Sequence, residues 1–239
     1  MKRKPVVLGL VLAAILGLAV MPATTRQGVD FHVTSHRLPA YVKLFDFFVR
    51  DAEYCQLASE VTRNLPSEAA RIQALYDWTR HAIRPTPPGW PVVDDHIQHI
   101  IIRGYGTDDQ MADVFTTLAT YAGLPAYWSV IERPGSGEQL ILSFARASSR
   151  WAVFDVANGI QFTNSSGAWA TPEELAAHPE LIRKSAGALV VRGIPYEQFF
   201  LGFTPPVVPH PLRAELQMPG PRLAASIQRV FTRESAHGP

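Results

Sequence analysis

The chain has 239 residues, 47% hydrophobic and 18% charged, so we expect one packed core with appended segments and exclude a disordered polyelectrolyte. Its formal net charge is +1, but without Lys2, Arg3 and Lys4 only 19 basic side chains face 21 acidic ones. A body without a basic surplus cannot neutralise a phosphate backbone, which argues against nucleic acid as a partner. The single cysteine, Cys55, excludes an intramolecular disulfide.

Residues 1–25 predict an N-terminal membrane segment. Basic residues 2–4 precede an uninterrupted apolar run from Val6 to Met21. The segment is either a retained signal-anchor that contacts the membrane through residues 5–23, or a cleaved secretory signal. We expect retention, because no small-residue cleavage pair ends the run. Either way the remainder is exported to the periplasmic or extracellular face, anchored or, after cleavage, secreted.

Helices are predicted first along the chain. Residues 26–65 form an N-terminal helical segment, in which the stretch from Leu38 to Arg63 places apolar residues near helical spacing. A second helix begins at residues 66–68, where a proline and an acidic residue suit a first turn, and ends near Ile83. The proline-rich residues 84–91 predict a loop. A third helix is expected from about Asp108 to Ala122.

Beyond Gly123 the pattern alternates and predicts an antiparallel sheet. Its strand candidates are Ala126–Ile131, Gln139–Ala145, Trp151–Val156 and a short Gly159–Phe162. Thr171 is expected to cap a following helix. We assign residues 66–203 to one α+β domain. Residues 204–239 are expected to form a proline-rich connector and an amphipathic tail that is helical or frayed.

Three blocks between Ala70 and Phe162 resemble the transglutaminase-like superfamily, whose fold is related to papain-type cysteine proteases. Residues 70–78 look like the family's helix before the active-site loop. Residues 104–112 look like the glycine-rich approach to the nucleophile helix, which ends in the family-like residues 123–126. Residues 150–155 look like the strand that ends in the catalytic aspartate. The order and spacing of the blocks are more specific than any one of them.

The resemblance implies a degenerate active site. The family's nucleophilic cysteine precedes the residue matching Ala112 by four, and this count leads to Asp108. The family's histidine is expected near Leu140, yet there is no histidine between His99 and His178. Only Asp155, matching the aspartate that orients the histidine, is retained. Without imidazole there is no general base, so we expect Asp108 to cap its helix and Asp155 to cap a strand end or bond to backbone.

The resemblance also suggests which residues surround the old cleft. The aromatic side chains among these candidates could line a groove or belong to the core. The acidic side chains could act as a glycosidase-like carboxylate pair or simply match a helix dipole. Cys55 could be a relocated nucleophile, but a buried structural thiol is the better interpretation. The cleft candidates are Trp90, Tyr105, Asp108, Asp109, Trp128, Gln139, Trp151 and Asp155.

The segment from Asp94 to His99 is the strongest metal-like cluster. His96 and His99 are three residues apart and can share a helix face, with two carboxylates next to them. The spacing matches no specific zinc motif, and a polar loop entering the following isoleucines is the simpler interpretation. We therefore predict no cofactor and treat these histidines as weak metal candidates.

Three functions remain open. The first is a non-catalytic, membrane-anchored module that binds a peptide, a cell-wall or polysaccharide ligand, or a partner protein. The second is an enzyme, an amide hydrolase or acyltransferase, with altered chemistry centred on Asp108 and Asp155 or on a metal at His96 and His99. The third is a structural assembly factor, which a cleft filled by Leu140 and Phe144 would favour.

Overall fold

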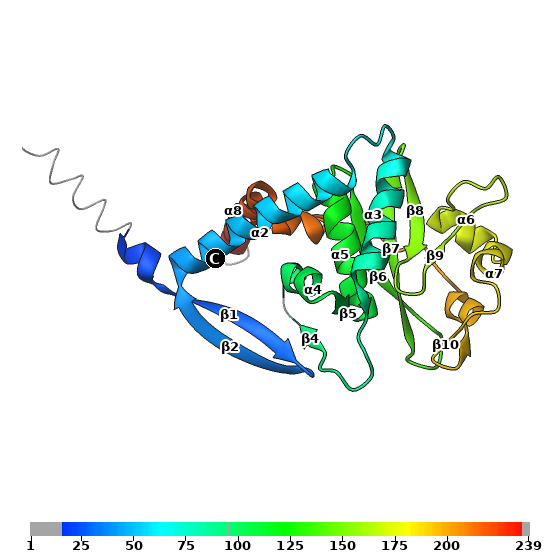
Figure 1. Cartoon of the computed structure of the whole chain (residues 1–239), viewed down its shortest axis with the longest axis horizontal. Helices are drawn as coiled ribbons and strands as arrows, with labels where there is room; N and C mark the ends of the chain where they lie inside the picture. The colour runs from blue at the N-terminus through cyan, green and yellow to red at the C-terminus, as the bar shows by residue number, and fades with distance from the viewer. Residues whose placement is uncertain (1–15, 95, 236–239) are drawn as a thin grey trace, which may run out of the picture.

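The computed structural model describes residues 16–94 and 96–235 and has an α+β architecture (Figure 1). A projecting N-terminal part leads into a domain built around a four-stranded sheet. The elements follow in chain order: β1 Pro22–Val29, β2 His32–Pro39, α2 Ala40–Val61, α3 Glu68–Ala82, β3 Arg84–Pro85, β4 Val93–Asp94, α4 Ile97–Arg103, β5 Tyr105–Gly106, α5 Asp108–Tyr121, β6 Ala126–Glu132, β7 Gln139–Ala147, β8 Arg150–Asp155, β9 Ile160–Gln161, α6 Pro172–Ala177, α7 Glu180–Ala186, β10 Val190–Val191, β11 Ile194–Pro195, η1 Tyr196–Phe200, η2 Ala214–Gln217 and α8 Pro219–Ser235.

The central sheet has the strand order β6-β7-β8-β9, with every neighbouring pair antiparallel. The predicted strands are confirmed, each within a residue or two of its expected bounds. Successive side chains on a strand point to opposite faces. Ala126, Ala145 and Phe154 therefore face one core cluster with α3 and α5, whereas Phe144 and Val153 face a second cluster. Figure 1 shows the sheet between α3 and α5 on one side and α6 and α7 on the other.

Helix caps account for several correctly predicted boundaries. The Ser67 hydroxyl accepts from the Ala70 N–H at 3.1 Å at the start of α3. At α6, the Thr171 hydroxyl accepts from the Glu174 N–H at 3.2 Å, and the Glu174 carboxylate accepts from the Thr171 N–H at 2.8 Å. This reciprocal pair is a capping box and confirms the predicted Thr171 cap. The tail predicted as helical or frayed is the helix α8.

Helix α2 begins and ends within two residues of its predicted bounds, but it buries different residues from those that suggested it. Leu44 and Phe45 are exposed, because the first half of α2 projects beyond the domain (Figure 1). The buried positions are instead Tyr54 and Ala58, one helical turn apart. Cys55 follows Tyr54 and faces solvent, so the prediction of a buried thiol is wrong. Adjacent helical residues point about 100° apart, since a turn holds roughly 3.6 residues.

The hairpin of β1 and β2 was not predicted; it occupies the beginning of residues 26–65, which were expected to be helical, so the helix starts only at Ala40. Its strands pair from Pro22↔Pro39 to Val29↔His32. Asp30 and Phe31 form the two-residue turn, with φ of 47° and 65°. Positive φ at both positions matches the twist of a hairpin, but phenylalanine is an unusual residue there, so the sequence gave no turn signal.

Residues 5–15 of the predicted membrane segment lie outside the described residues. Within 16–94 and 96–235, no helix combines the length and apolar character that crossing a bilayer requires.

Candidate functional site

The N-terminus of α5 holds the position expected for a nucleophile. Thr107 is its N-cap, with extended backbone, and its N–H donates to the Gln110 side chain at 3.1 Å. Asp108 is the first helical residue, so the prediction that Asp108 caps the helix is wrong. Thr107 precedes it and already provides the non-helical residue that a cap requires. The Thr107 hydroxyl donates to the Asp109 carboxylate at 2.5 Å, which also orients the second acidic residue.

Arg192 connects the two edges of the expected cleft. Its Nη2 donates to Asp108 Oδ2 at 2.9 Å, and its Nη1 donates to the Gln139 carbonyl oxygen at 2.6 Å. Glu138 lies 3.7 Å from the same guanidinium. The start of α5 and the start of β7 are thus bridged by one side chain. A guanidinium carries donors in a planar fork, which suits this double contact.

The β10–β11 hairpin positions Arg192. Val190↔Pro195 and Val191↔Ile194 pair across a two-residue turn, in which Arg192 has φ 51° and Gly193 has φ 79°. Two successive positive φ values are typical of a type I′ turn, and glycine supplies the second at little cost. Sequence analysis missed Arg192. The signal that could have found it is Arg192-Gly193 between two pairs of apolar residues.

The place expected for the histidine belongs to the hydrophobic core. Leu140 is 1% exposed and Phe144 is fully buried, both in the cluster on the face away from α5. The Phe144 ring stacks on Tyr127 with centroids 4.8 Å apart. Asp155 follows Val153 by two residues and so shares this face of the sheet. The side chains that would surround a catalytic imidazole are therefore packed against each other.

Asp155 is wholly buried and fully engaged in hydrogen bonds. Its Oδ2 accepts from the Tyr196 hydroxyl at 2.7 Å and the Asn158 amide at 2.8 Å, while its Oδ1 accepts from the Asn158 N–H at 2.9 Å. The backbone bond confirms one of its two predicted roles. Burial raises the pKa of Asp155, the Asn158 and Tyr196 bonds oppose this rise, and the Asp108 charge adds to it.

Tyr196 is the second residue that sequence analysis missed. It opens η1, and burial raises its pKa well above the ordinary value for tyrosine. Its ring packs with Phe162 and Phe200 in the second core cluster. The Asp155–Tyr196 bond therefore fastens η1 to the end of β8. This carboxylate orients a tyrosine where the resemblance predicts that it would orient a histidine.

The aromatic cleft candidates do not form one group. Trp90 packs edge-on against Tyr105 at 5.1 Å, just before α5. Trp128 donates its indole N–H to Asp113 at 2.5 Å and lies under Arg213. Trp151 packs against Tyr127 on the other face of the sheet, with centroids 5.0 Å apart.

Asp113, another unpredicted residue, is a buried acid on α5. Its Oδ2 lies 2.8 Å from Arg213 Nη2, and burial raises the pKa of its carboxyl against the influence of Arg213 and Trp128. The three side chains hold the segment before η2 against α5. Their packing assigns Trp128 to a structural contact between the sheet, α5 and the C-terminal connector.

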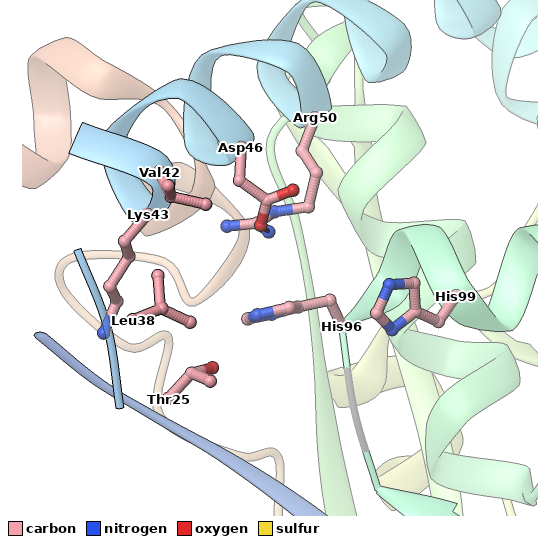
Figure 2. Close-up of a pocket in the computed structure, with 8 residues that line it drawn as sticks. All are labelled: Thr25, Leu38, Val42, Lys43, Asp46, Arg50, His96 and His99. Atoms are coloured by element: carbon pink, nitrogen blue, oxygen red, sulfur yellow. Dashed lines mark hydrogen bonds and ion pairs between the residues drawn. The ribbon is translucent and has the colours of Figure 1, made fainter. Parts of the chain in front are cut away.

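His96 and His99 lie apart from these residues, at the start of α4. The segment expected as a loop enters this helix at Ile97. Both histidines line a cavity of about 310 Å³ beneath α2, with ring centroids 5.9 Å apart (Figure 2). Among residues 16–94 and 96–235, no group of three histidine, cysteine or acidic side chains is placed to hold a metal ion.

These residues form an α+β domain in which the N-terminus of α5 meets an antiparallel sheet and a buried aspartate ends the strand β8. Residues 55–169 match the family model of the transglutaminase-like superfamily. The chain thus contains a transglutaminase-like domain, as its sequence blocks predict. A comparison with curated proteins finds no match.

Three solved structures are similar over part of the chain. A proposed cysteine protease of Cytophaga hutchinsonii shares 14% identity at a TM-score of 0.38, covering 48% of this chain and 42% of the other. A proposed protease of Parabacteroides distasonis shares 13% identity at a TM-score of 0.37, covering 56% of this chain and 35% of the other. A structure described as a TGase shares 13% identity at a TM-score of 0.36, covering 60% of this chain and 46% of the other. The chain thus spans less than half the length of each.

Proposed function

We propose that this chain is a non-catalytic transglutaminase-like module, anchored to a membrane with its domain exported, that contacts a ligand or partner through its surface. The observation that carries the proposal is the Arg192 bridge between Asp108 and the start of β7. An aspartate paired with a guanidinium is a poor acyl nucleophile, and Leu140 supplies no base to activate a thiol or water.

The burial of the expected histidine position also bears on what the module binds. Leu140 and Phe144 are buried in the core cluster on the sheet face away from α5, so neither side chain is available to a ligand. This favours contact with a partner protein over binding of a peptide or a cell-wall polysaccharide in the cleft. The exported location rests on the basic residues 2–4 and the apolar run that follows them.

One observation favours the enzyme alternative. Asp155 is a buried carboxyl with a raised pKa, close enough to Asp108 for the two charges to interact. Carboxyl groups with perturbed pKa values are frequent at catalytic sites. Against this role, Asp155 already accepts three hydrogen bonds, and a fixed acceptor of this kind also occurs in structural networks.

The experiment that separates these functions is an assay of amide hydrolysis and amine transfer over a broad peptide panel. The full chain in neutral detergent is compared with Asp108→Ala and Arg192→Gln, with and without zinc, and a bacterial transglutaminase serves as positive control. The proposal predicts no turnover above Asp108→Ala for any peptide. Turnover that Asp108→Ala removes would overturn it and establish aspartate-based chemistry. Turnover unaffected by Asp108→Ala but dependent on zinc would overturn it as well.

A further inference from the structure

A second cavity lies between the projecting half of α2, the strand β1 and the beginning of α8. Its volume is about 1040 Å³, and it shares Thr25, Lys43, Arg50 and His96 with the smaller cavity in Figure 2. It lies away from the cleft, because neither Asp108 nor Asp155 lines it. Whatever occupies it would bind independently of the transglutaminase-like site.

The charge of this cavity differs from that of the molecule. Its lining includes Arg26, Lys43, Arg50 and Arg222, and no carboxylate. The body of the chain, by contrast, has slightly more acidic than basic side chains. Arg50 is paired with Asp46, but the lining as a whole carries a surplus of positive charge and is complementary to a negatively charged ligand.

Arg50 is the best-placed group for such an anion. It is only 6% exposed, and Figure 2 shows its side chain reaching from α2 toward the space that the His96 ring also enters. Its Nη1 pairs with Asp46, one turn earlier on α2, whose side chain is 55% exposed and lines only the smaller cavity. A guanidinium has five N–H donors, so a second acceptor can bind beside Asp46.

The remaining wall of the cavity is apolar. Leu44, Phe48 and Leu223 are all at least half exposed, and Phe47 lies under the Arg222 guanidinium at 5.0 Å. Exposed aliphatic and aromatic side chains beside a cationic centre fit a ligand with both a hydrocarbon part and an acidic group. A small inorganic anion would leave this apolar surface in water.

We propose that this cavity binds an acidic amphiphile, with a phosphate or carboxylate head among its three arginines and Lys43 and a hydrocarbon chain along Leu44 and Phe48. We assign the source to a membrane lipid. The apolar run that ends at Met21 is followed at once by β1, and residues 23–26 of β1 line the cavity. A bilayer holding the N-terminal run would lie next to this part of the molecule.

The test measures binding of dioctanoyl phosphatidic acid to the full chain in dodecyl maltoside by isothermal titration calorimetry. Dioctanoyl phosphatidylcholine, octanoate and inorganic phosphate are titrated in parallel. The key variant is the double substitution Arg26→Gln and Arg222→Gln, because both side chains are exposed and their loss should not prevent folding. Arg63→Gln with Arg84→Gln is the matched control, since both are exposed arginines outside the cavity.

Phosphatidic acid should bind at least about tenfold more tightly than phosphatidylcholine. The Arg26/Arg222 double variant should bind phosphatidic acid about tenfold or more weakly than the wild type, since hydrogen bonds to charged groups contribute roughly 1.5–3 kcal/mol. If octanoate bound as tightly as phosphatidic acid, the source would be a free fatty acid, and the assignment to a membrane lipid would be overturned. Equal binding of inorganic phosphate or phosphatidylcholine, an equal loss in the control variant, or a dimer that excludes every ligand would overturn the proposal itself.

Discussion

The transglutaminase-like domain and the projecting N-terminal part use the same residue types in opposite ways. In the domain, phenylalanines such as Phe115 and Phe154 are fully buried, and Asp155 is held by three hydrogen bonds. In the projecting half of α2, Phe45 and Phe48 are exposed, and Phe48 lines a cationic cavity. A filled interior stabilises a fold, whereas exposed apolar and charged groups are free to bind. The comparison therefore assigns stability to the packed domain, and the proposed binding to the projecting part outside the cleft.

The largest expected effect contrasts a buried with an exposed phenylalanine. Phe154→Ala should lower the free energy of unfolding by about 3–5 kcal/mol, because the ring packs between α3 and α5 against Tyr76 and Phe115. Phe45→Ala, at 70% exposure, should change it by less than about 0.5 kcal/mol. Urea denaturation of both variants measures the difference. Similar losses would mean that the projecting part is packed in solution.

Removal of the Tyr196 hydroxyl should have the next-largest effect on the free energy of unfolding. Tyr196→Phe leaves Asp155 buried with one acceptor site unpaired, so we expect a loss of about 1.5–3 kcal/mol at pH 7. Tyr41→Phe on the projecting part is the matched control, because Tyr41 is half exposed. The same denaturation experiment measures both. A loss no larger than the control's would show that the Asp155–Tyr196 bond does not fasten η1.

The same variant should change the response to alkaline pH. Burial raises the pKa of Tyr196 above its ordinary value near 10, so its contribution to stability is complete below pH 10 and declines as pH rises toward the folded-state pKa. One such tyrosine makes the free energy of unfolding fall more steeply with pH, by about 1.4 kcal/mol per pH unit. Stability measured between pH 9 and 11.5 should therefore fall less steeply in Tyr196→Phe. Identical slopes would contradict the buried environment.

The smallest effect is expected at the cleft bridge. Arg192→Gln should cost only about 0–1 kcal/mol, because Arg192 and Asp108 are both partly exposed and solvent screens their attraction. Denaturation in low and high salt measures this contribution, which should shrink as salt rises. A loss of several kcal/mol would mean that the bridge is part of the stabilising core.

The elements that the sequence predicted well are those defined by local patterns. A proline and an acidic residue marked the start of α3, the Thr171 cap marked the start of α6, and alternation marked β6 to β8. Asp108 and Asp155 could be located by the spacing of family-like blocks. The pairing of these aspartates with Arg192 and Tyr196 could not be predicted, since the partners lie 84 and 41 residues further along the chain and a local turn signal does not show what its residues contact. The exposed side of α2 also escaped prediction, because periodicity reports an apolar face but not whether anything covers it.

The most direct test of the central claim is the rate of ammonia release from glutamine-containing peptides by the full chain, measured beside Asp108→Ala. A non-catalytic domain predicts two rates that are equal and indistinguishable from buffer. A wild-type rate clearly above that of Asp108→Ala would contradict it, because the carboxylate paired with Arg192 would then be acting in a reaction.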